Sequence, residues 1–351
     1  MEHLQQQYQR SHEKLSFIGP DGNLAINKAK VLVIGAGGLG CPCLLHLAGS
    51  GVGTIGIADN DVVSVSNLHR QLLYQIQHVH KPKVLVAAEQ LGAHNPHINV
   101  QTHQLYVDTQ NLPALIFPYD IVVDATDNFA TRYAINDACV LANKPLVYGA
   151  IHQTEGHLTV FNYQGSATLR CLFPQNNDTA TAVPSCADIG AYNVITGIIG
   201  NMMANEVIKI LVGHSGVLQN TLLHLDCLTY QIRKIQFLRN AASKQISMQA
   251  VSNSVIVPII TPTELLQQQV SLLLIDIRTY DERNTMHIGG IHVPMQQLLN
   301  NPAAYMQPTQ TVVLYCASGQ RSYIAAMQLQ GFATTIYSLS GGAEAFVRLN
   351  A

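Results

Sequence analysis

One stretch near the N-terminus, Val31–Gly40, constrains the fold more than any other part of the chain. It reads VLVIGAGGLG, and apolar residues then recur with helical spacing from Leu44 to Ala48. A strand, a glycine turn and a helix in this order predict the start of a Rossmann-type βαβ unit. Glycine lets the backbone turn sharply and approach a phosphate, while the helix start offers free N–H groups to it. The glycines concerned are Gly35, Gly37, Gly38 and Gly40.

A carboxylate follows the second predicted strand. The apolar run Thr54–Ala58 ends at Asp59. This is near the spacing of about 20 residues at which an acidic side chain binds the ribose of a nucleotide. Together the two features predict a nucleotide site, without saying what the nucleotide is used for.

The connector after this strand is rich in groups that bind phosphate. It carries amide, guanidinium and ammonium side chains, the last at the start of a predicted helix, Lys83–Leu91. Such groups suit a triphosphate better than the pyrophosphate bridge of a dinucleotide. Each of them taken alone is also typical of a solvated surface. The residues are Asn67, Arg70, Gln71 and Lys83.

A polar turn follows another predicted strand, which ends at Asp124. Acidic side chains at the carboxyl end of a strand lie where open α/β sheets bind ligands. Two carboxylates close to a triphosphate, here Asp124 and Asp127, can hold Mg²⁺. Asp127 and Asn128 also precede a predicted helix, Arg132–Ala142, so either can cap that helix as well.

The composition excludes several classes of protein. Of the 351 residues 48% are hydrophobic and 11% are charged, the net charge is −2, and no Lys/Arg cluster stands out. This favours a large core and gives no electrostatic basis for binding nucleic acid or a membrane surface. The N-terminus lacks a secretory pattern, so a cytoplasmic location is predicted. The apolar stretch Val194–Val212 contains Glu206 and Lys209, which predicts a buried helix rather than a membrane span.

The pattern of strands and helices predicts two α/β domains. The first covers residues 1–240 and a smaller second one covers residues 254–351. Residues 241–253 are rich in Ala, Ser and Gln and lack a core pattern, so they are predicted to be a linker. Within the domains we expect turns at Gly19–Gly22, before a short helix Leu24–Lys30, and around Asp281 and Glu282.

The cysteines do not form a disulfide framework. There are seven, an odd number without dense spacing, and a reducing cytoplasm is the simpler setting. No CxxC pair occurs, so a structural tetrathiolate zinc site has no support from the sequence. Cys186 follows the long polar stretch Gly165–Ser185 and is expected to be exposed.

Cys316 is the strongest candidate for a chemically active thiol. It follows the predicted strand Thr311–Tyr315 and opens a tight loop that leads into a helix. N–H groups converge in such a loop and stabilise a thiolate or a persulfide anion. Cys139 and Cys227 lie inside apolar runs and fit structural cysteines better. The predicted persulfide loop also contains one positive charge, that of Arg321. The residues of the loop after Cys316 are Ala317, Ser318, Gly319, Gln320, Arg321 and Ser322.

With these residues set out, the first domain resembles the MoeB/ThiF family, bacterial relatives of the ubiquitin-activating enzymes. The second domain resembles a rhodanese, and adenylating enzymes with a fused rhodanese form a known MoeBR or MoeZ-like subgroup. The implied fold is a Rossmann-like ATP-binding domain followed by a smaller α/β rhodanese domain. The resemblance of the first domain is carried by Arg10, Gly35–Gly40, Asp59, Asn67–Gln71, Lys83 and Asp124–Asn128. That of the second is carried by Asp276–Arg278, His287–Pro294 and Cys316–Ser322.

The resemblance implies an ATP-dependent adenylyltransferase that also transfers sulfur. In this family the C-terminal Gly-Gly carboxylate of a ubiquitin-fold sulfur carrier, MoaD-like or ThiS-like, attacks the α-phosphate of ATP. A persulfide on Cys316 would then supply the sulfur of a thiocarboxylate, with a cysteine desulfurase or thiosulfate as sulfur donor. The family is typically a homodimer.

Individual roles follow from the same resemblance. Asp59 would hold the ribose, Asp127 would bind Mg²⁺, and Arg10 would reach into the partner subunit's site. Cys186 matches a cysteine that some relatives use for a covalent carrier intermediate. The phosphates and the rest of the nucleotide would be bound by Asn67, Arg70, Gln71, Lys83 and Asn128.

The chain departs from the family where many members bind zinc. Those members carry two CxxC pairs. Here only Cys171 remains of the first pair, with Thr168 in its partner's place, and the second pair is missing around residues 240–249. We therefore predict no zinc.

Two other functional classes remain as alternatives. An NAD-dependent oxidoreductase explains the glycines and Asp59, but not Arg70, Lys83, Asp127 or the second domain. A non-catalytic persulfide relay or scaffold would have an inactive first domain, although its nucleotide residues look complete. A tRNA-modification cyclase of the same superfamily is disfavoured by the fused rhodanese and by the lack of a basic run. The sequence does not choose among molybdopterin, thiamin, cysteine and tRNA thiolation.

Overall fold

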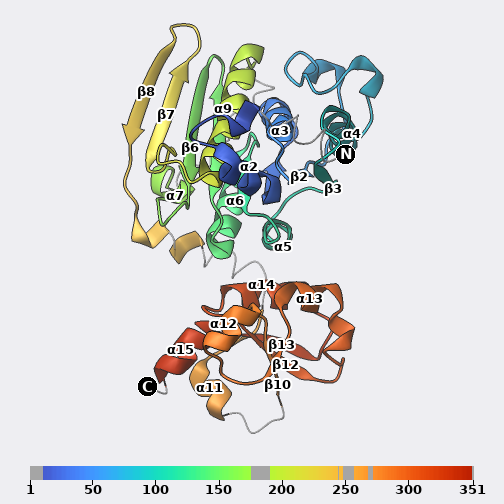
Figure 1. The fold of residues 1–351 in the computed structure, drawn as a ribbon, viewed down its shortest axis with the longest axis vertical. Coiled ribbons are helices and arrows are strands. Elements are labelled where there is room, and N and C mark those ends of the chain that lie inside the picture. The colour runs from blue at the N-terminus through green and yellow to red at the C-terminus, as the bar shows by residue number, and fades with distance from the viewer. Residues whose placement is uncertain (1–10, 175–189, 244, 248–256, 268–271, 350–351) are drawn as a thin grey trace. The chain divides into compact units, whose positions relative to one another are not determined.

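The chain folds into two α/β units, each built on its own sheet (Figure 1). The computed structural model describes residues 11–174, 190–243, 245–247, 257–267 and 272–349. The first unit comprises residues 1–112 and 118–248, and the second comprises residues 113–117 and 249–351. The predicted fold class is therefore confirmed.

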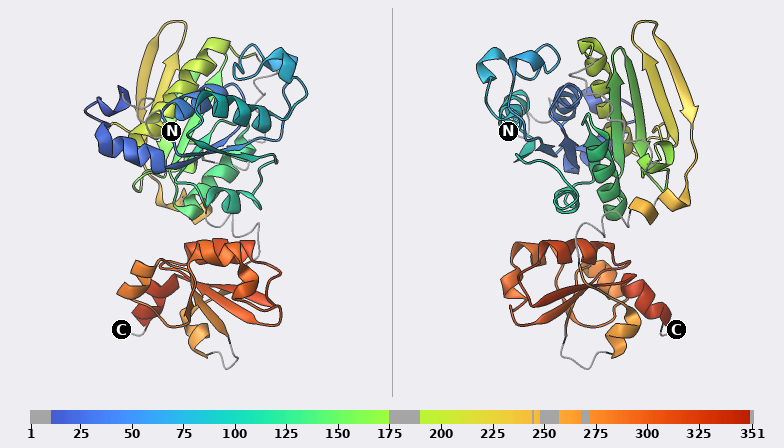
Figure 2. Two further views of the ribbon diagram at one scale, coloured as in Figure 1. Left: turned by 45° about the vertical axis from the view of Figure 1, so that its right-hand side comes forward. Right: turned by 180° about the vertical axis from the view of Figure 1, so that it is seen from behind.

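The first unit is organised around an eight-stranded sheet in the order β3-β2-β1-β4-β5-β6-β7-β8. Strands β3 to β5 along this order are parallel, whereas β5 to β8 pair antiparallel. Figure 2 shows β7 and β8 extending the sheet at one edge. The strands are β1 (Lys30–Ile34), β2 (Thr54–Ala58), β3 (Asn99–His103), β4 (Ile121–Asp124), β5 (Leu146–His152), β6 (Glu155–Phe161), β7 (Thr221–Asp226) and β8 (Gln231–Gln236).

The glycine turn lies where the strand order reverses. Strand β1 pairs with β2 on one side and with β4 on the other, and open α/β sheets bind ligands at such a switch point. The helices and 3-10 turns between residues 11 and 211 are α2 (Gly19–Lys28), α3 (Gly40–Gly49), η1 (Val65–Asn67), η2 (Ile76–His78), α4 (Lys83–His94), α5 (Leu112–Ile116), α6 (Phe129–Ala142), α7 (Leu169–Leu172) and α9 (Asn193–Leu211).

Helix α9 packs in the core of the first unit. It contacts α3 and strands β5 and β6, and Ile199, Met203 and Val207 are fully buried. The buried Glu206 accepts a hydrogen bond of 3.0 Å from the Leu218 N–H and pairs with Lys209. By length and composition alone the helix could cross a membrane, but its apolar side chains pack against the sheet, as predicted.

The turn predicted at Gly19–Gly22 is wrong, because these residues form the first turn of α2. Proline at the start of a helix costs no hydrogen bond, since the first N–H groups have no partner within the helix. Pro20 occupies such a position, and Asp21 adds a negative charge near the positive end of the helix dipole. The sequence Gly-Pro-Asp-Gly therefore forms the start of a helix rather than a loop.

The second unit is built on a five-stranded sheet in the order β11-β10-β12-β13-β9, with all pairs parallel. The turn predicted around Asp281 and Glu282 is also wrong, since both lie in helix α12, which Thr279 caps. The strands are β9 (Ile259–Ile260), β10 (Leu273–Asp276), β11 (Ile291–His292), β12 (Thr311–Tyr315) and β13 (Thr335–Leu339). The helices are α11 (Pro262–Gln267), α12 (Tyr280–Thr285), α13 (Met295–Asn300), η3 (Pro302–Ala304), α14 (Gln320–Gln328) and α15 (Gly342–Leu349).

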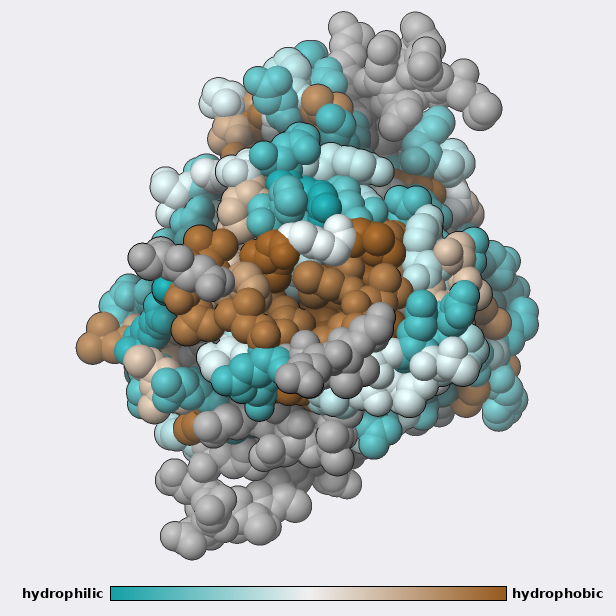
Figure 3. All heavy atoms as spheres, turned by 90° about the horizontal axis from the view of Figure 1, so that it is seen from below, coloured by the Kyte–Doolittle hydropathy of each residue, from teal (hydrophilic) through white to brown (hydrophobic). Residues whose placement is uncertain are grey.

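Part of the core of the second unit lies close to the surface. Figure 3 shows apolar side chains gathered on the face of this unit that is seen from below. Partly buried apolar side chains pack against the buried residues Ile260, Val313, Tyr315, Leu339 and Ala343. The apolar residues of this kind are Leu265, Leu272, Leu274, Met286, Ile288, Tyr337 and Phe346.

Two positions in the turn after β1 require glycine, because other backbone atoms lie too close to admit a side chain. A Cβ on Gly35 would lie 2.6 Å from the Ala125 carbonyl oxygen, and its φ is +98°. A Cβ on Gly40 would lie 1.9 Å from the Gly35 carbonyl oxygen. The turn after β1 therefore packs directly on the turn after β4, with no room for a side chain between them.

We expect Gly40→Ala to destabilise the first unit by roughly 3 kcal/mol or more, because backbone must move to admit the methyl group. Gly92→Ala is the matched control. It lies in helix α4, where an added methyl group would have no atom within 4 Å, and it should be neutral or stabilise by up to about 1 kcal/mol. Urea unfolding followed by circular dichroism measures both; equal midpoints would contradict the expectation.

Candidate functional site

The Asp59 carboxylate braces the glycine turn. One oxygen accepts a hydrogen bond of 2.7 Å from the Ala36 N–H, and the other accepts one of 2.8 Å from the Asp61 N–H. Each carboxylate oxygen retains a second lone pair. Asp59, the residue predicted to bind ribose, therefore lies at the glycine turn, and these two hydrogen bonds hold its carboxylate in place.

The predicted phosphate-binding side chains lie against the same turn. Arg70 Nη2 donates to Asn67 Oδ1 at 2.9 Å. Methyl groups on Gly37 and Gly38 would contact Gln71 Nε2 and Arg70 Cδ, both at 3.6 Å. Gln71 is buried, and its Oε1 has no hydrogen-bond partner among the described residues. The structure thus brings Asn67, Arg70 and Gln71 together over the glycines.

Lys83 is the first residue of α4, and its ammonium pairs with Asp61. The Nζ–Oδ2 distance is 2.8 Å, and the lysine side chain is 4% exposed while the aspartate is 68% exposed. A buried ammonium needs a charged partner, so the ion pair fixes Lys83 at the edge of the site. Sequence reasoning missed Asp61, although an acidic residue two positions after Asp59 was a visible signal.

In the turn after β4, helix capping and any metal binding belong to different side chains. Asn128 is the N-cap of α6, with its Oδ1 accepting from the Thr131 N–H at 2.9 Å. The buried Asp124 accepts from the N–H and hydroxyl of Thr126 at 3.0 and 2.6 Å. Asp127 is exposed, and within the part of the chain that is described its carboxylate makes no hydrogen bond or ion pair. It is therefore the carboxylate available to a cation.

Sequence reasoning also missed Arg132, which lies one helical turn beyond Asn128 and bonds to Thr126 and Tyr148. Its position inside a helix gave no signal that it reaches back to the polar turn. The predicted site residues Arg10 and Cys186 lie outside the described residues.

Cys316 lies at the end of β12, where the loop before α14 folds around its sulfur. The Gly319 N–H donates to Sγ at 3.2 Å, and the Ser322 hydroxyl lies 3.8 Å from Sγ and 3.0 Å from the Gly319 carbonyl oxygen, either of which can accept its hydrogen bond. Gly319 has φ +88° and precedes the first residue of α14. The Ser338 hydroxyl lies 2.8 Å from that of Ser322. The sulfur is thus held among N–H and O–H donors at a helix start, as predicted, and these donors suit an anionic sulfur.

The charge of Arg321 is paired with Glu282 on α12. Nη1 lies 2.8 Å from Oε2, and Nη2 pairs with Oε1. Thr279 also donates its N–H and hydroxyl to Glu282, at 3.0 and 3.1 Å. The hydrogen bonds from Arg321 lower the pKa of Glu282 to about 2. Sequence reasoning missed Glu282, which lies 39 positions before Arg321.

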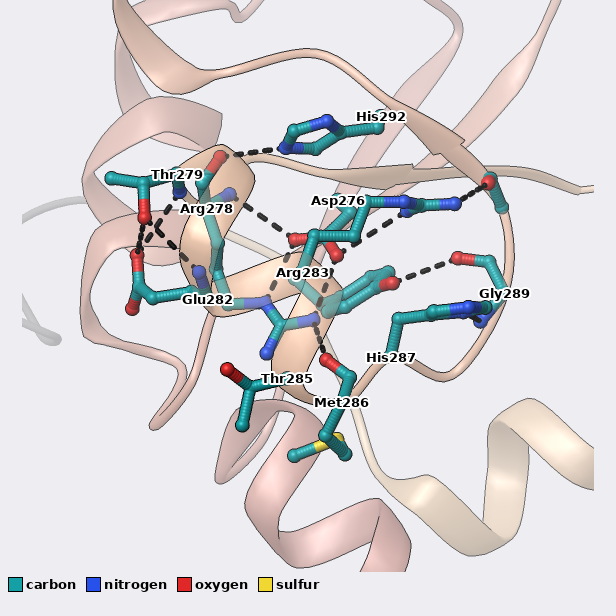
Figure 4. Close-up of polar contacts among 12 residues, drawn as sticks. Asp276, Arg278, Thr279, Glu282, Arg283, Thr285, Met286, His287, Gly289 and His292 are labelled. Atoms are coloured by element: carbon teal, nitrogen blue, oxygen red, sulfur yellow. Dashed lines mark hydrogen bonds and ion pairs between the residues drawn. The ribbon is translucent and has the colours of Figure 1, made fainter.

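A buried ion cluster holds the base of α12 to the sheet (Figure 4). Arg278 donates to both Asp276 oxygens, at 2.9 and 2.8 Å, and Arg283 Nη1 lies 3.3 Å from Oδ2. Burial acts to raise the pKa of Asp276, but the hydrogen bonds from Arg278 outweigh it, and the pKa is lowered. Arg278 and Arg283 also donate to the carbonyls of Met286 and Gly290. The cluster fixes the helix that carries Glu282.

The sulfur of Cys171, the one thiol left of the expected zinc-binding pairs, is surrounded by hydrogen-bond donors. The Thr168 and Asn240 N–H groups donate to Cys171 Sγ at 3.4 and 3.3 Å, and Ser243 also hydrogen-bonds to it. The first part of the predicted linker packs here on the first unit, where Ser243 and Ser247 are buried. Among the described residues, no group of three or more His, Cys, Asp or Glu could hold a metal ion.

Comparison with known proteins matches both units to families. The ThiF family matches residues 8–246, and the rhodanese-like domain family matches residues 261–349. The chain is 37% identical over 350 residues to the adenylyltransferase and sulfurtransferase MOCS3 of Anopheles gambiae, covering 90% of this chain and 79% of that protein. It is 37% identical over 358 residues to the probable adenylyltransferase/sulfurtransferase MoeZ of Mycobacterium tuberculosis, covering 94% and 90%.

Two further matches concern the first unit. The sulfur carrier protein adenylyltransferase of Thermus thermophilus is 44% identical over 228 residues, which cover 64% of this chain and 84% of that protein. The crystal structure of E. coli MccB with ATP superposes with a TM-score of 0.56 at 23% identity, covering 63% of this chain and 66% of that one. At that identity the likeness is one of fold.

We expect Glu282→Gln to lower the stability of the second unit at neutral pH by roughly 0.5–1 kcal/mol, since the ion pair is about one-third exposed. Glutamine can retain the capping box through its single amide oxygen. The substitution removes the charge and the second carboxylate oxygen, which accepts from Arg321 Nη2. Because the folded pKa is depressed from 4.5 to about 2, the ion pair stabilises the folded unit above pH 4.5 and loses this effect as the pH falls towards 2. Thermal unfolding of both proteins across this range measures the effect. A difference that stays constant between pH 7 and pH 3 would contradict it.

Proposed function

Because the chain belongs to the ThiF family and carries a rhodanese-like domain, we propose that it activates and then sulfurates a ubiquitin-fold carrier protein. The C-terminal Gly-Gly carboxylate of the carrier is adenylylated by ATP, and a persulfide on Cys316 supplies sulfur to the adenylate. The observation that carries the proposal is the convergence of the glycine turn, Asp59, Lys83 and Asp127 at one sheet edge, in a chain that also holds the Cys316 loop.

Adenylylation needs positioning and charge neutralisation more than a dedicated base. The carrier carboxylate attacks the α-phosphorus of ATP, the bond to the β-phosphate breaks, and pyrophosphate leaves. Asp59 would hold the ribose, and Asp127 would hold Mg²⁺, which would supply positive charge to the phosphates. The phosphates are bound by Asn67, Arg70, Gln71 and Lys83, with Asn128 beside them.

Sulfur transfer follows on the second unit. The Cys316 thiolate attacks the sulfane sulfur of thiosulfate or of a persulfide on a cysteine desulfurase. Sulfite or the desulfurase thiol leaves, and Cys316 then carries the outer sulfur of a persulfide. This sulfur attacks the adenylate carbonyl and AMP leaves, which gives an acyl disulfide. A thiol reductant then cleaves the S–S bond, releases the carrier thiocarboxylate and returns Cys316 as a thiol. The N–H group of Gly319 and the hydroxyl of Ser322 support the anionic sulfur.

The partners and setting extend the proposal. We propose a cytoplasmic homodimer in which Arg10 completes the partner subunit's site, and in which Cys186 can form a covalent link to the carrier. Exposed apolar side chains on the segment before α4 support an interface there, because such patches mark interaction sites. They are Val62 at 47%, Val65 at 59%, Leu72 at 76% and Ile76 at 68% exposure.

The alternatives are not favoured. An NAD-dependent oxidoreductase leaves the paired Lys83, the unpaired Asp127 and the rhodanese-like domain without a role. A non-catalytic relay leaves an intact nucleotide site unused. The relatives that match most of the chain are named as adenylyltransferase and sulfurtransferase together.

We also propose that the chain holds no structural zinc. A tetrahedral zinc site takes thiolate or imidazole ligands, whereas Thr168, Asn240 and Ser243 surround the single thiol of Cys171. The hydrogen bonds to its sulfur join the segment around Asn240 to α7 without a metal.

The two chemistries should separate by mutation. Asp127→Ala should reduce carrier-dependent ATP–pyrophosphate exchange by about 100-fold or more, because the metal loses its carboxylate, and should leave thiosulfate sulfurtransferase activity intact. Cys316→Ala should abolish the sulfurtransferase activity and spare the exchange. If either substitution removed both activities from a folded protein, the assignment of one reaction to each unit would be wrong.

Restoring the thiols should restore a metal site. The triple variant Thr168→Cys, Asn240→Cys, Ser243→Cys, which keeps Cys171, should bind one zinc ion per chain after dialysis, measured by elemental analysis. The same variant with Cys171→Ser is the matched control and should bind far less. Stoichiometric zinc in the unmodified protein would contradict the proposal.

A further inference from the structure

We propose that Arg132 is a positioning residue that holds the turn Asp124–Asn128 so that Asp127 faces the magnesium ion bound with ATP. The inference rests on the proposed adenylylation and adds to it a residue that touches neither the nucleotide nor the metal. Arg132 contacts both the turn, at Thr126, and the neighbouring strand, at Tyr148.

The guanidinium of Arg132 connects the turn to the neighbouring strand. Nη2 donates to the Thr126 carbonyl at 2.7 Å, and Nη1 donates to the Tyr148 hydroxyl at 2.9 Å. Tyr148 lies on β5 directly beside Asp124 on β4 in the sheet register. One planar group therefore spans the end of β4, the turn that follows it and the adjacent strand.

Burial and stacking leave Arg132 little freedom. The residue is 7% exposed, and its Cζ lies 4.9 Å from the ring centroid of Tyr148 and 5.5 Å from that of Phe129. A guanidinium stacked on aromatic rings with two donors engaged is held in one orientation. A lysine ammonium cannot keep both hydrogen bonds and the stacking.

The carbonyl that Arg132 binds belongs to the peptide group joining Thr126 to Asp127. The Asp127 side chain makes no hydrogen bond or ion pair within the described residues, so the backbone sets the direction of its Cα–Cβ bond and thus the region that its carboxylate can reach. Arg132 and Asp124 fix that backbone before Asp127, and the Asn128 cap fixes it afterwards. Removing the arginine would free the one anchor that holds the Thr126 carbonyl.

Asp124 holds the same turn at other atoms. Its Oδ1 accepts from the Thr126 N–H and hydroxyl, but a carboxylate has no proton to donate to the Thr126 carbonyl. The buried Asp124 Oδ2 and Arg132 Nε have no hydrogen-bond partner among the described residues. The hydrogen bond to the Thr126 carbonyl is therefore the contribution of Arg132 to the orientation of the turn.

The test is ATP binding by calorimetry with and without Mg²⁺, using the full chain. It needs no carrier. Arg132→Lys should bind ATP alone as the wild type does but lose about tenfold of the added affinity that Mg²⁺ gives, in line with the loss of groups that orient a metal ligand. Tyr148→Phe removes one of the two hydrogen bonds of Arg132 and should lose a smaller part of the added affinity that Mg²⁺ gives. This second variant keeps the test available if Arg132→Lys fails to fold.

Arg170→Lys is the matched control. Arg170 is also buried, pairs with Asp137 and stacks on Tyr133 at 4.8 Å, and both of these partners lie on α6 rather than in the turn. It should leave the Mg²⁺ effect unchanged even if stability falls. An unchanged Mg²⁺ effect in folded Arg132→Lys and Tyr148→Phe, or an equal loss in Arg170→Lys, would overturn the inference. If the wild type bound no ATP, the proposed function itself would fail, which is a different result.

Discussion

The first unit depends on two backbone segments packing against each other without side chains between them. The turn after β1 touches the turn after β4 at Gly35 and Ala125, and it folds back on itself at Gly40. This contact places the glycine turn, with Asp59 bonded to it, beside the turn that carries Asp127. Nucleotide chemistry needs a phosphate-binding turn and a metal carboxylate close together, and this packing brings them together before any ligand binds.

The two units use one local design for different chemistry. In each, a buried parallel strand ends in a loop with a glycine at positive φ, and a helix follows. Gly35 serves the predicted phosphate turn and Gly319 serves the sulfur of Cys316. At each site a basic side chain is also held by an ion pair with a carboxylate, Lys83 by Asp61 and Arg321 by Glu282. Fixed charges reorganise little when a reaction proceeds, which is how preorganised sites stabilise transition states.

Local patterns in the sequence predicted the parts of both sites that depend on neighbouring residues. Strand, glycine turn and helix identified Gly35–Gly40, and the end of a strand identified Asp59 and Cys316. Asp61, Glu282 and Arg132 were missed because their roles depend on residues brought near by the fold. Glu282 meets an arginine 39 positions away, and Arg132 on α6 bonds to a tyrosine on β5. The turn predicted at Gly19–Gly22 failed because Pro also suits the first turn of a helix.

The central claim, that one polypeptide both adenylylates and sulfurates a carrier, is tested most directly by the intact mass of the carrier. A ubiquitin-fold protein ending in Gly-Gly is incubated with the chain and Mg·ATP, first alone and then with a sulfur donor and a thiol reductant. We expect a carrier heavier by one AMP in the first case, and one with a terminal oxygen replaced by sulfur in the second. A carrier whose mass stays unchanged in both, for every Gly-Gly protein of the host, would contradict the claim.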